Sequence, residues 1–150
     1  MITSPPTPLV STPTVAARRG GYVVAIAINL VMLYVANHLL AWDLLPFLTA
    51  DFERVLLLIN ISLVATILVN AVYLGYDQGW FRSLGQVGLN LISLVVGIRM
   101  YQVFPFDFSA YEFSWATVVR VMIVLGIVGL AIGTVAELVK LARRGFLVLQ

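Results

Sequence analysis

Three ionisable side chains, His38, Arg99 and Arg120, lie inside long apolar stretches of this 150-residue chain. Each arginine is about five residues, hence about 7 Å at 1.5 Å per helical residue, from the end of its stretch. Ionisable groups inside apolar stretches often mark ion or ligand pathways. Together the three would form a cationic belt that could bind an anion or a lipid headgroup. Alternatively, each arginine reaches water or headgroup phosphates, or pairs with a carboxylate of the adjoining loops.

Neutral polar side chains recur at helical spacing on two further stretches. One stripe consists of Ser62, Thr66 and Asn70, and the other of Gln86, Asn90 and Ser93. Spacings of three and four residues place each set on one face of a helix. Such side chains hydrogen-bond across helices in membranes, so we expect the two stripes to face each other. None of them ionises, which favours helix packing over an ion path.

The last apolar stretch has a face of small residues, Gly126, Gly129 and Gly133. Gly129 and Gly133 form a small-xxx-small pair, which lets two helix backbones approach closely. We therefore expect this face to take part in association. Glu137 prolongs the face and is expected to pair with Lys140 near the headgroups, the alternative being a proton or ion site.

Four apolar stretches of about 20 residues or more must position these groups, at residues 22–42, 55–76, 84–104 and 115–139. A helix of that length crosses the hydrocarbon core of a bilayer, which is about 30 Å thick. Hydrophobic residues make up 61% of the chain and charged residues 11%, whereas soluble domains average about 45–50% and 25%. The sequence therefore predicts an all-α polytopic membrane protein, in which residues 21–142 form an up-down bundle of four transmembrane helices.

Short tails flank the predicted membrane domain. Residues 1–20 are rich in Pro, Ser and Thr and predict a disordered tail, and residues 143–150 predict a short second tail. Basic residues are retained on the cytoplasmic side during insertion. The flanks and the middle loop carry Arg18, Arg19, Arg82, Lys140, Arg143 and Arg144. We therefore expect both termini to be cytoplasmic in a plasma membrane, and the bacterial inner membrane fits the small size and short loops.

The loop before the last stretch carries aromatic residues at alternate positions. They are Phe104, Phe106 and Phe108, followed by Tyr111, Phe113 and Trp115. This alternation places the rings on one face of an extended segment. That face is expected to press on lipid headgroups or on helix ends, and the alternative is a surface for a partner.

The sequence argues against several biochemical classes. It has no Cys and one His, so neither a thiolate site nor a multi-histidine metal site is available within it. It contains no nucleophile, base and acid set, no Gly-rich phosphate loop and no basic stripe suited to nucleic acid. We therefore expect no enzyme activity, no cofactor and no nucleic-acid partner.

The remaining function classes are interaction and transport. The sequence favours a structural, accessory or interaction protein, whose partners are membrane lipids, further copies of the chain or a larger membrane complex. The alternative is a small oligomeric transporter or channel that binds an anion or a lipid headgroup through His38, Arg99 and Arg120.

Overall fold

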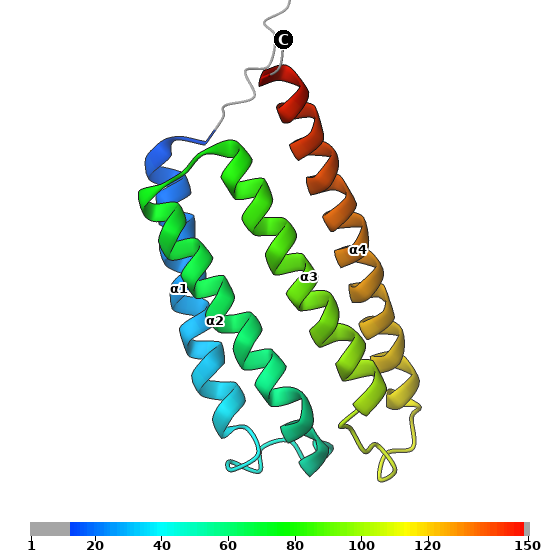
Figure 1. The fold of residues 1–150 in the computed structure, drawn as a ribbon. Helices are drawn as coiled ribbons and strands as arrows, with labels where there is room; N and C mark the ends of the chain where they lie inside the picture. Colours follow the sequence, from blue (N-terminus) through cyan, green and yellow to red (C-terminus); the bar gives the residue numbers. More distant parts are fainter. Residues whose placement is uncertain (1–12, 149–150) are drawn as a thin grey trace, which may run out of the picture.

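The fold is all-helical (Figure 1). The computed structural model describes residues 13–148, with side chains described for residues 13–145. The elements are α1 (Val15–His38), the short 3-10 turn η1 (Ala50–Phe52), α2 (Glu53–Gly75), α3 (Gly79–Val103) and α4 (Trp115–Val148). Within residues 13–148, four helices are long and apolar enough to cross a membrane, which confirms the predicted all-α class and agrees with the four predicted stretches.

Two helices extend beyond their apolar stretches. α1 begins at Val15, where the Thr14 hydroxyl caps the helix by accepting a hydrogen bond of 3.2 Å from the Ala17 N–H. Residues 15–20 therefore belong to α1 rather than to the predicted tail, and residues 1–12 of that tail lie outside the described residues. α4 likewise continues through residues 143–148. Hydropathy marks where lipid contact ends, whereas a helix continues until a cap or breaker, and residues 140–148 contain no proline.

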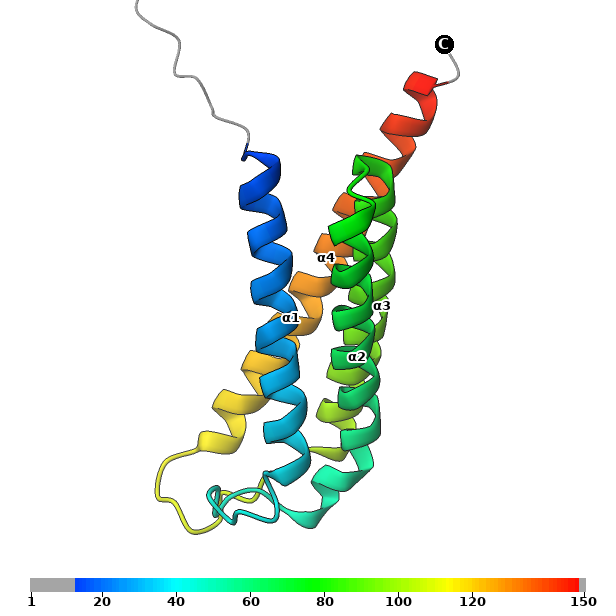
Figure 2. The same ribbon diagram turned by 90° about the vertical axis from the view of Figure 1, so that its left-hand side faces the viewer.

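The helices form an open row rather than a closed bundle. Each packs on its neighbour in the chain, α1 on α2, α2 on α3 and α3 on α4, and consecutive helices run antiparallel (Figure 1). Within the described residues α1 and α4 make no extended contact. In the side view α1 stands on one side of α2 and α3, and α4 crosses obliquely, with its beginning on the side of α1 and its end on the opposite side (Figure 2). The first and last helices of the predicted up-down arrangement thus do not pack on each other, and lipid would supply no hydrophobic force to bring them together.

Few side chains are buried in residues 13–145. The buried hydrophobic residues are Ala36, Phe52, Val55, Tyr73 and Val87. At most 17% of the most apolar part of any helix is buried, and Leu57 is 68% exposed. In water this would be an unusually large apolar surface, whereas in a bilayer the same side chains contact acyl chains.

The two long loops pair with each other at the end of the row remote from the termini, here called the loop end. Leu48 and Phe106 form an isolated antiparallel bridge, and the Asp107 N–H donates to the Phe47 carbonyl at 2.7 Å. The Phe47 ring stacks on Phe108 with centroids 5.2 Å apart. Part of the predicted aromatic face therefore packs on the neighbouring loop and joins the α1–α2 hairpin to the α3–α4 hairpin.

Candidate functional site

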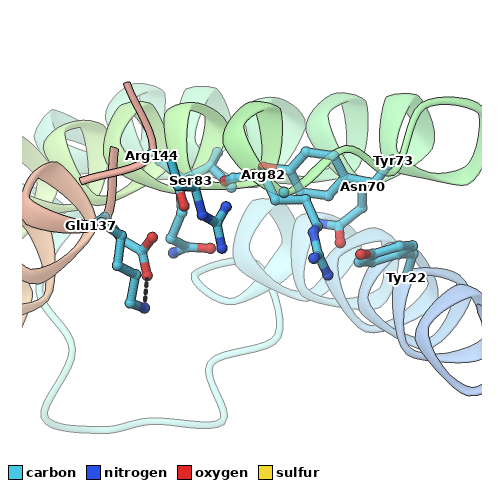
Figure 3. A pocket seen from close by; sticks show the side chains of 11 residues that line it. Tyr22, Asn70, Tyr73, Arg82, Ser83, Glu137 and Arg144 are labelled. Atoms are coloured by element: carbon cyan, nitrogen blue, oxygen red, sulfur yellow. Dashed lines mark hydrogen bonds and ion pairs between the residues drawn. The ribbon is translucent and has the colours of Figure 1, made fainter. Parts of the chain in front are cut away.

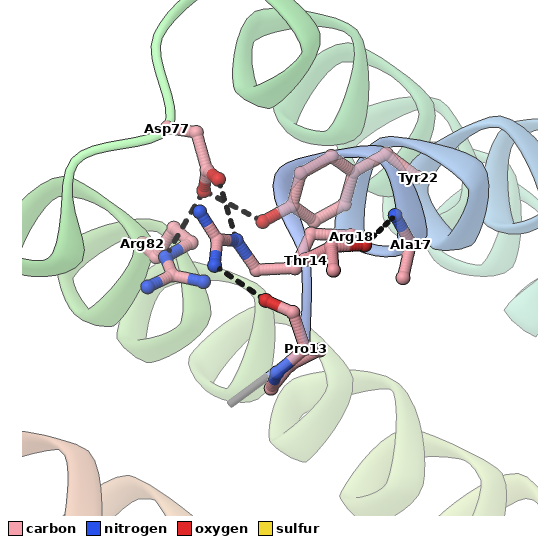
Figure 4. A network of polar contacts seen from close by, with 7 residues as sticks. All are labelled: Pro13, Thr14, Ala17, Arg18, Tyr22, Asp77 and Arg82. Carbon is pink, nitrogen blue, oxygen red and sulfur yellow. Dashed lines mark hydrogen bonds and ion pairs between the residues drawn. The ribbon is translucent and has the colours of Figure 1, made fainter. Parts of the chain in front are cut away.

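Four side chains, here called the ion cluster, join α1 to the turn between α2 and α3 (Figure 4). They are Arg18, Tyr22, Asp77 and Arg82, at the terminal end of the row, where α1 begins and α4 finishes. The Asp77 carboxylate accepts hydrogen bonds from the Tyr22 hydroxyl at 2.7 Å and from Arg18 Nε at 2.8 Å. Arg82 Nε lies 3.1 Å from Asp77 Oδ1 as an ion pair without hydrogen-bond geometry. One carboxylate in a short turn therefore holds groups from α1 and α3.

The ion cluster is partly shielded from water. The Asp77 side chain is 12% exposed, and those of Arg18 and Arg82 are 28% and 36% exposed. Hydrogen bonds from Tyr22 and Arg18 stabilise the charged carboxylate and hold the pKa of Asp77 below its ordinary value of 3.8. Asp77 is therefore ionised at neutral pH and is shared by two guanidinium groups.

Tyr73 of α2 reaches across to α3 beside the ion cluster. Its side chain is buried, and its hydroxyl donates to the Arg82 carbonyl at 2.9 Å. The ring packs against Tyr22 with a centroid separation of 5.3 Å and lies edge-on to Phe81 at 5.9 Å. A Cβ at Gly85 would overlap the Tyr73 hydroxyl and lie 3.0 Å from Cζ. The missing side chain at Gly85 is what permits this close approach of α2 and α3.

A polar cavity of about 420 Å³, here called the terminal cavity, is lined by residues from all four helices (Figure 3). Its charged lining residues are Arg82, Glu137, Lys140 and Arg144, and its neutral polar ones include Asn70, Ser83 and Gln86. The volume lies within the range of about 300–1,000 Å³ typical of small-molecule sites. The cavity therefore combines space, hydrogen-bonding groups and several charges at the terminal end of the row.

α4 brings three of the four charged groups, Glu137, Lys140 and Arg144, to the terminal cavity. Glu137, 17% exposed, pairs with Lys140 Nζ at 2.6 Å, as predicted. Arg144 lies against the beginning of α3, where its Nη1 is 2.7 Å and its Cζ 3.2 Å from the position that a Cβ of Gly79 would occupy. Arg144 reaches this place because α4 continues beyond the apolar stretch that ends at residue 139.

The two predicted polar stripes form hydrogen bonds within their own helices. In α2, Thr66 Oγ1 donates to the Ser62 carbonyl and Asn70 Nδ2 donates to the Thr66 carbonyl, both at 2.8 Å. In α3, Gln86 Nε2 donates to Asn90 Oδ1 at 2.9 Å. A carbonyl one turn back is the nearest acceptor for a helical hydroxyl or amide in lipid. The stripes meet at one point, since Asn70 and Gln86 both line the terminal cavity.

The small-residue face of α4 is divided between two environments. Gly133 packs on α3, since a Cβ there would lie 3.4 Å from Nδ2 of the buried Asn90. Ser93, one turn further along α3, is half-buried. In contrast, a Cβ on Gly126 or Gly129 would meet no described atom within 4 Å. These two glycines are therefore the part of the face that remains open to a partner.

His38 and its neighbours form contacts at the loop end of α1. Its Nδ1 lies 2.8 Å from the Tyr34 carbonyl, and its ring stacks on Tyr34 and Trp42 with centroids 4.2 and 5.7 Å away. Asn37 and Asn60 exchange side-chain hydrogen bonds of 2.8 and 2.9 Å, which join α1 to α2. The local surroundings of His38 are thus aromatic rather than cationic.

Arg99 and Arg120 have aromatic and amide neighbours. The Arg120 guanidinium lies over the Phe104 ring at 4.1 Å and over the Tyr101 ring at 5.6 Å. Arg99 Nη1 is 3.5 Å from Gln102 Oε1. Within residues 13–145 neither arginine forms an ion pair, and no hydrogen bond links either of them to His38. Direct contacts therefore do not link His38, Arg99 and Arg120 into the predicted belt.

The ion cluster was not predicted from the sequence, in which Arg18 and Arg82 were used only to infer the orientation of the helices in the membrane. A signal for the cluster is nevertheless present. Asp77 and Glu137 are the two carboxylates among the many basic residues expected on the terminal side. A carboxylate in a short loop between apolar helices needs a cationic partner, and Arg82 is five residues away.

Comparison with known proteins gives no match to a family model, to a curated protein or to a solved structure.

Proposed function

We propose that this chain is an integral membrane protein of the interaction type, which self-associates in the bilayer through the part of the small-residue face of α4 that does not pack on α3. The proposal depends chiefly on Gly126 and Gly129, which have open space beside them on an outer helix of the open row. In lipid, close packing of small residues drives helix association. A second copy supplies the matching surface, because a twofold axis places the same patch on both sides of the contact.

The proposed orientation has both termini on the cytoplasmic side of a plasma membrane. The distribution of basic residues supports it, since Arg18, Arg82 and Arg144 all belong to the terminal end. The small size and short loops fit a bacterial inner membrane. Labelling of a single cysteine introduced at Gly75, which faces open space, by an impermeant maleimide should require permeabilised inner membranes. Labelling from the outside would contradict this orientation.

Cysteine crosslinking is a direct test of self-association, because the chain contains no Cys. We expect Gly129→Cys to form a disulfide-linked dimer when membranes are oxidised. Gly88→Cys is the matched control, since Gly88 lies on α3 and also has open space beside it. We further expect Gly129→Leu to lower the association constant about tenfold, as measured by energy transfer between labelled copies in liposomes, because losing about 1.4 kcal/mol of packing has that effect.

Equal crosslinking at residues 88 and 129, or association that Gly129→Leu leaves unchanged, would contradict the proposal. Single copies bound to a different membrane protein in native membranes would instead favour an accessory subunit of a larger complex. In that case Gly129→Leu, but not Gly88→Leu, should release the chain from the complex.

The second candidate is a small oligomeric transporter or channel that binds an anion or a lipid headgroup through His38, Arg99 and Arg120. The observation in its favour is that both arginines are exposed and unpaired with carboxylates within residues 13–145. Anion flux into liposomes containing the purified protein should then fall sharply in Arg99→Ala and in Arg120→Ala. Protein that supports no flux above empty liposomes would rule this candidate out.

A further inference from the structure

The terminal cavity and the adjoining ion cluster hold more positive than negative charge. They bring together Arg18, Arg82, Lys140 and Arg144 with the carboxylates of Asp77 and Glu137. Glu137 is held by Lys140, and Asp77 is shared by two guanidinium groups. Arg144 forms no ion pair within residues 13–145, and residues 1–12 and 146–150 contain no Asp or Glu. Two positive charges therefore remain without a carboxylate.

These charges lie next to an apolar surface. Leu84 and Leu138, from the same ends of α3 and α4, are 50% and 49% exposed, as expected for side chains that face lipid. Positive charge beside hydrocarbon costs free energy unless water or an opposite charge compensates it. An anion seated between the two helices would provide that compensation.

We propose that the terminal cavity binds a phosphate group, with Arg144 and Arg82 as its principal ligands. A guanidinium group presents a planar fork of N–H donors that matches two phosphate oxygens at once. Figure 3 shows Arg82 from α3 and Arg144 from α4 at the same cavity. The amides of Asn70 and Gln86 supply further donors. Glu137 does not oppose the anion with a free charge, because Lys140 neutralises it.

The space for Arg144 depends on Gly79. The Arg144 guanidinium occupies the place that a side chain at position 79 would fill. The cavity of about 420 Å³ then leaves room for a phosphate and for part of the group that carries it. A larger residue at position 79 would displace the guanidinium without changing the charge of the protein.

Two sources could supply the phosphate. The terminal end lies where a span leaves the hydrocarbon core, which is the depth of lipid headgroups. The phosphodiester of phosphatidylglycerol can therefore reach the cavity from the membrane, and a free phosphate compound can reach it from water. Both offer the same oxyanion to the same arginines.

The test uses the full chain in dodecyl maltoside micelles, which contain no phosphate, with either phosphatidylglycerol or inorganic phosphate as the probe. Native mass spectrometry counts the bound lipid, and the thermal midpoint is measured in phosphate against chloride at equal ionic strength. We expect Arg144→Gln to weaken binding about tenfold or more, the size of losing a hydrogen bond between charged groups. Arg143→Gln removes the same charge from the neighbouring residue, which does not line the cavity, and should bind as the parent does.

Gly79→Val provides a second test in which no charge is lost. We expect it to weaken phosphate binding as Arg144→Gln does, while Gly75→Val, at a glycine with open space, leaves binding unchanged. Binding of phosphatidylglycerol alone assigns the site to a headgroup, and stabilisation by inorganic phosphate in micelles without lipid assigns it to a free compound. Equal losses in Arg143→Gln and Arg144→Gln, or no binding that depends on Arg144 with either probe, would overturn the proposal. Neither result depends on self-association through Gly129.

Discussion

Replacing Gly85 by alanine should lower the free energy of unfolding by about 1–3 kcal/mol, the usual cost of one extra group in a tightly packed site. The added methyl would overlap the Tyr73 hydroxyl and approach Val69 Cγ1 to 3.1 Å. Tyr73 would have to move and lose its hydrogen bond to the Arg82 carbonyl. Unfolding of the purified protein by dodecyl sulfate, followed by far-ultraviolet circular dichroism, measures the difference.

Gly88→Ala is the matched control, because Gly88 lies three residues further along α3 and has open space beside it. Alanine is a better helix former than glycine by about 0.5–1 kcal/mol, so this variant should be as stable as the parent or slightly more stable. Tyr73→Phe removes the overlapping hydroxyl and should recover part of the loss in a Gly85→Ala background. Equal stability of the Gly85→Ala and Gly88→Ala proteins would show that Tyr73 does not pack against Gly85.

Replacing Asp77 by asparagine should release the beginning of α1 from the turn between α2 and α3. Asparagine keeps the size of the side chain but removes the charge that holds Arg18 and Arg82. Spin labels on cysteines introduced at Gly20 and Gly75, both beside open space, report the separation of the two segments. We expect a narrow distance distribution in the parent protein and a broad one, with a longer mean distance, in Asp77→Asn.

Asp51→Asn is the control for Asp77→Asn. It removes the same charge from an exposed pair at the loop end, where Asp51 Oδ1 lies 3.4 Å from Arg54 Nε. Exposed pairs contribute little to stability, so the distance distribution should stay narrow. A narrow distribution in Asp77→Asn as well would mean that packing alone, for instance of Tyr22 on Tyr73, holds α1 in place.

The pH dependence of the same spin-label distance follows from the lowered pKa of Asp77. Because the pKa is lower in the folded protein, the ion cluster contributes its full stability above the ordinary value of 3.8 and loses it as the pH falls through the folded value. The distribution should therefore remain narrow from pH 8 to about pH 4 and broaden below it. Broadening between pH 5 and 7 would contradict this assignment.

The open row connects the two proposals made for this protein. A closed bundle would bury the inner faces of α1 and α4 against each other and leave no room for the terminal cavity. Because α1 and α4 do not pack on each other, Arg82 and Arg144 line an open cavity, and Gly129 has open space beside it. Phosphate binding uses the C-terminal end of α4, whereas self-association uses its middle around Gly129, so that the two proposals can be tested independently.

Some features of this protein can be derived from the sequence by itself, because they belong to single helices. The number of spans follows from the length and hydropathy of each stretch, and the pairing of Glu137 with Lys140 follows from their spacing of three residues. The open row, the division of the glycine face between Asn90 and open space, and the ion cluster were decided by the tertiary structure.

Arg18 and Asp77 are 59 residues apart, and they meet only because α1 packs on α2 in one particular rotation and height. Hydropathy does not specify that arrangement. In lipid a side chain that faces another helix and one that faces an acyl chain are equally apolar, so the pattern of hydrophobic residues does not reveal which faces are in contact.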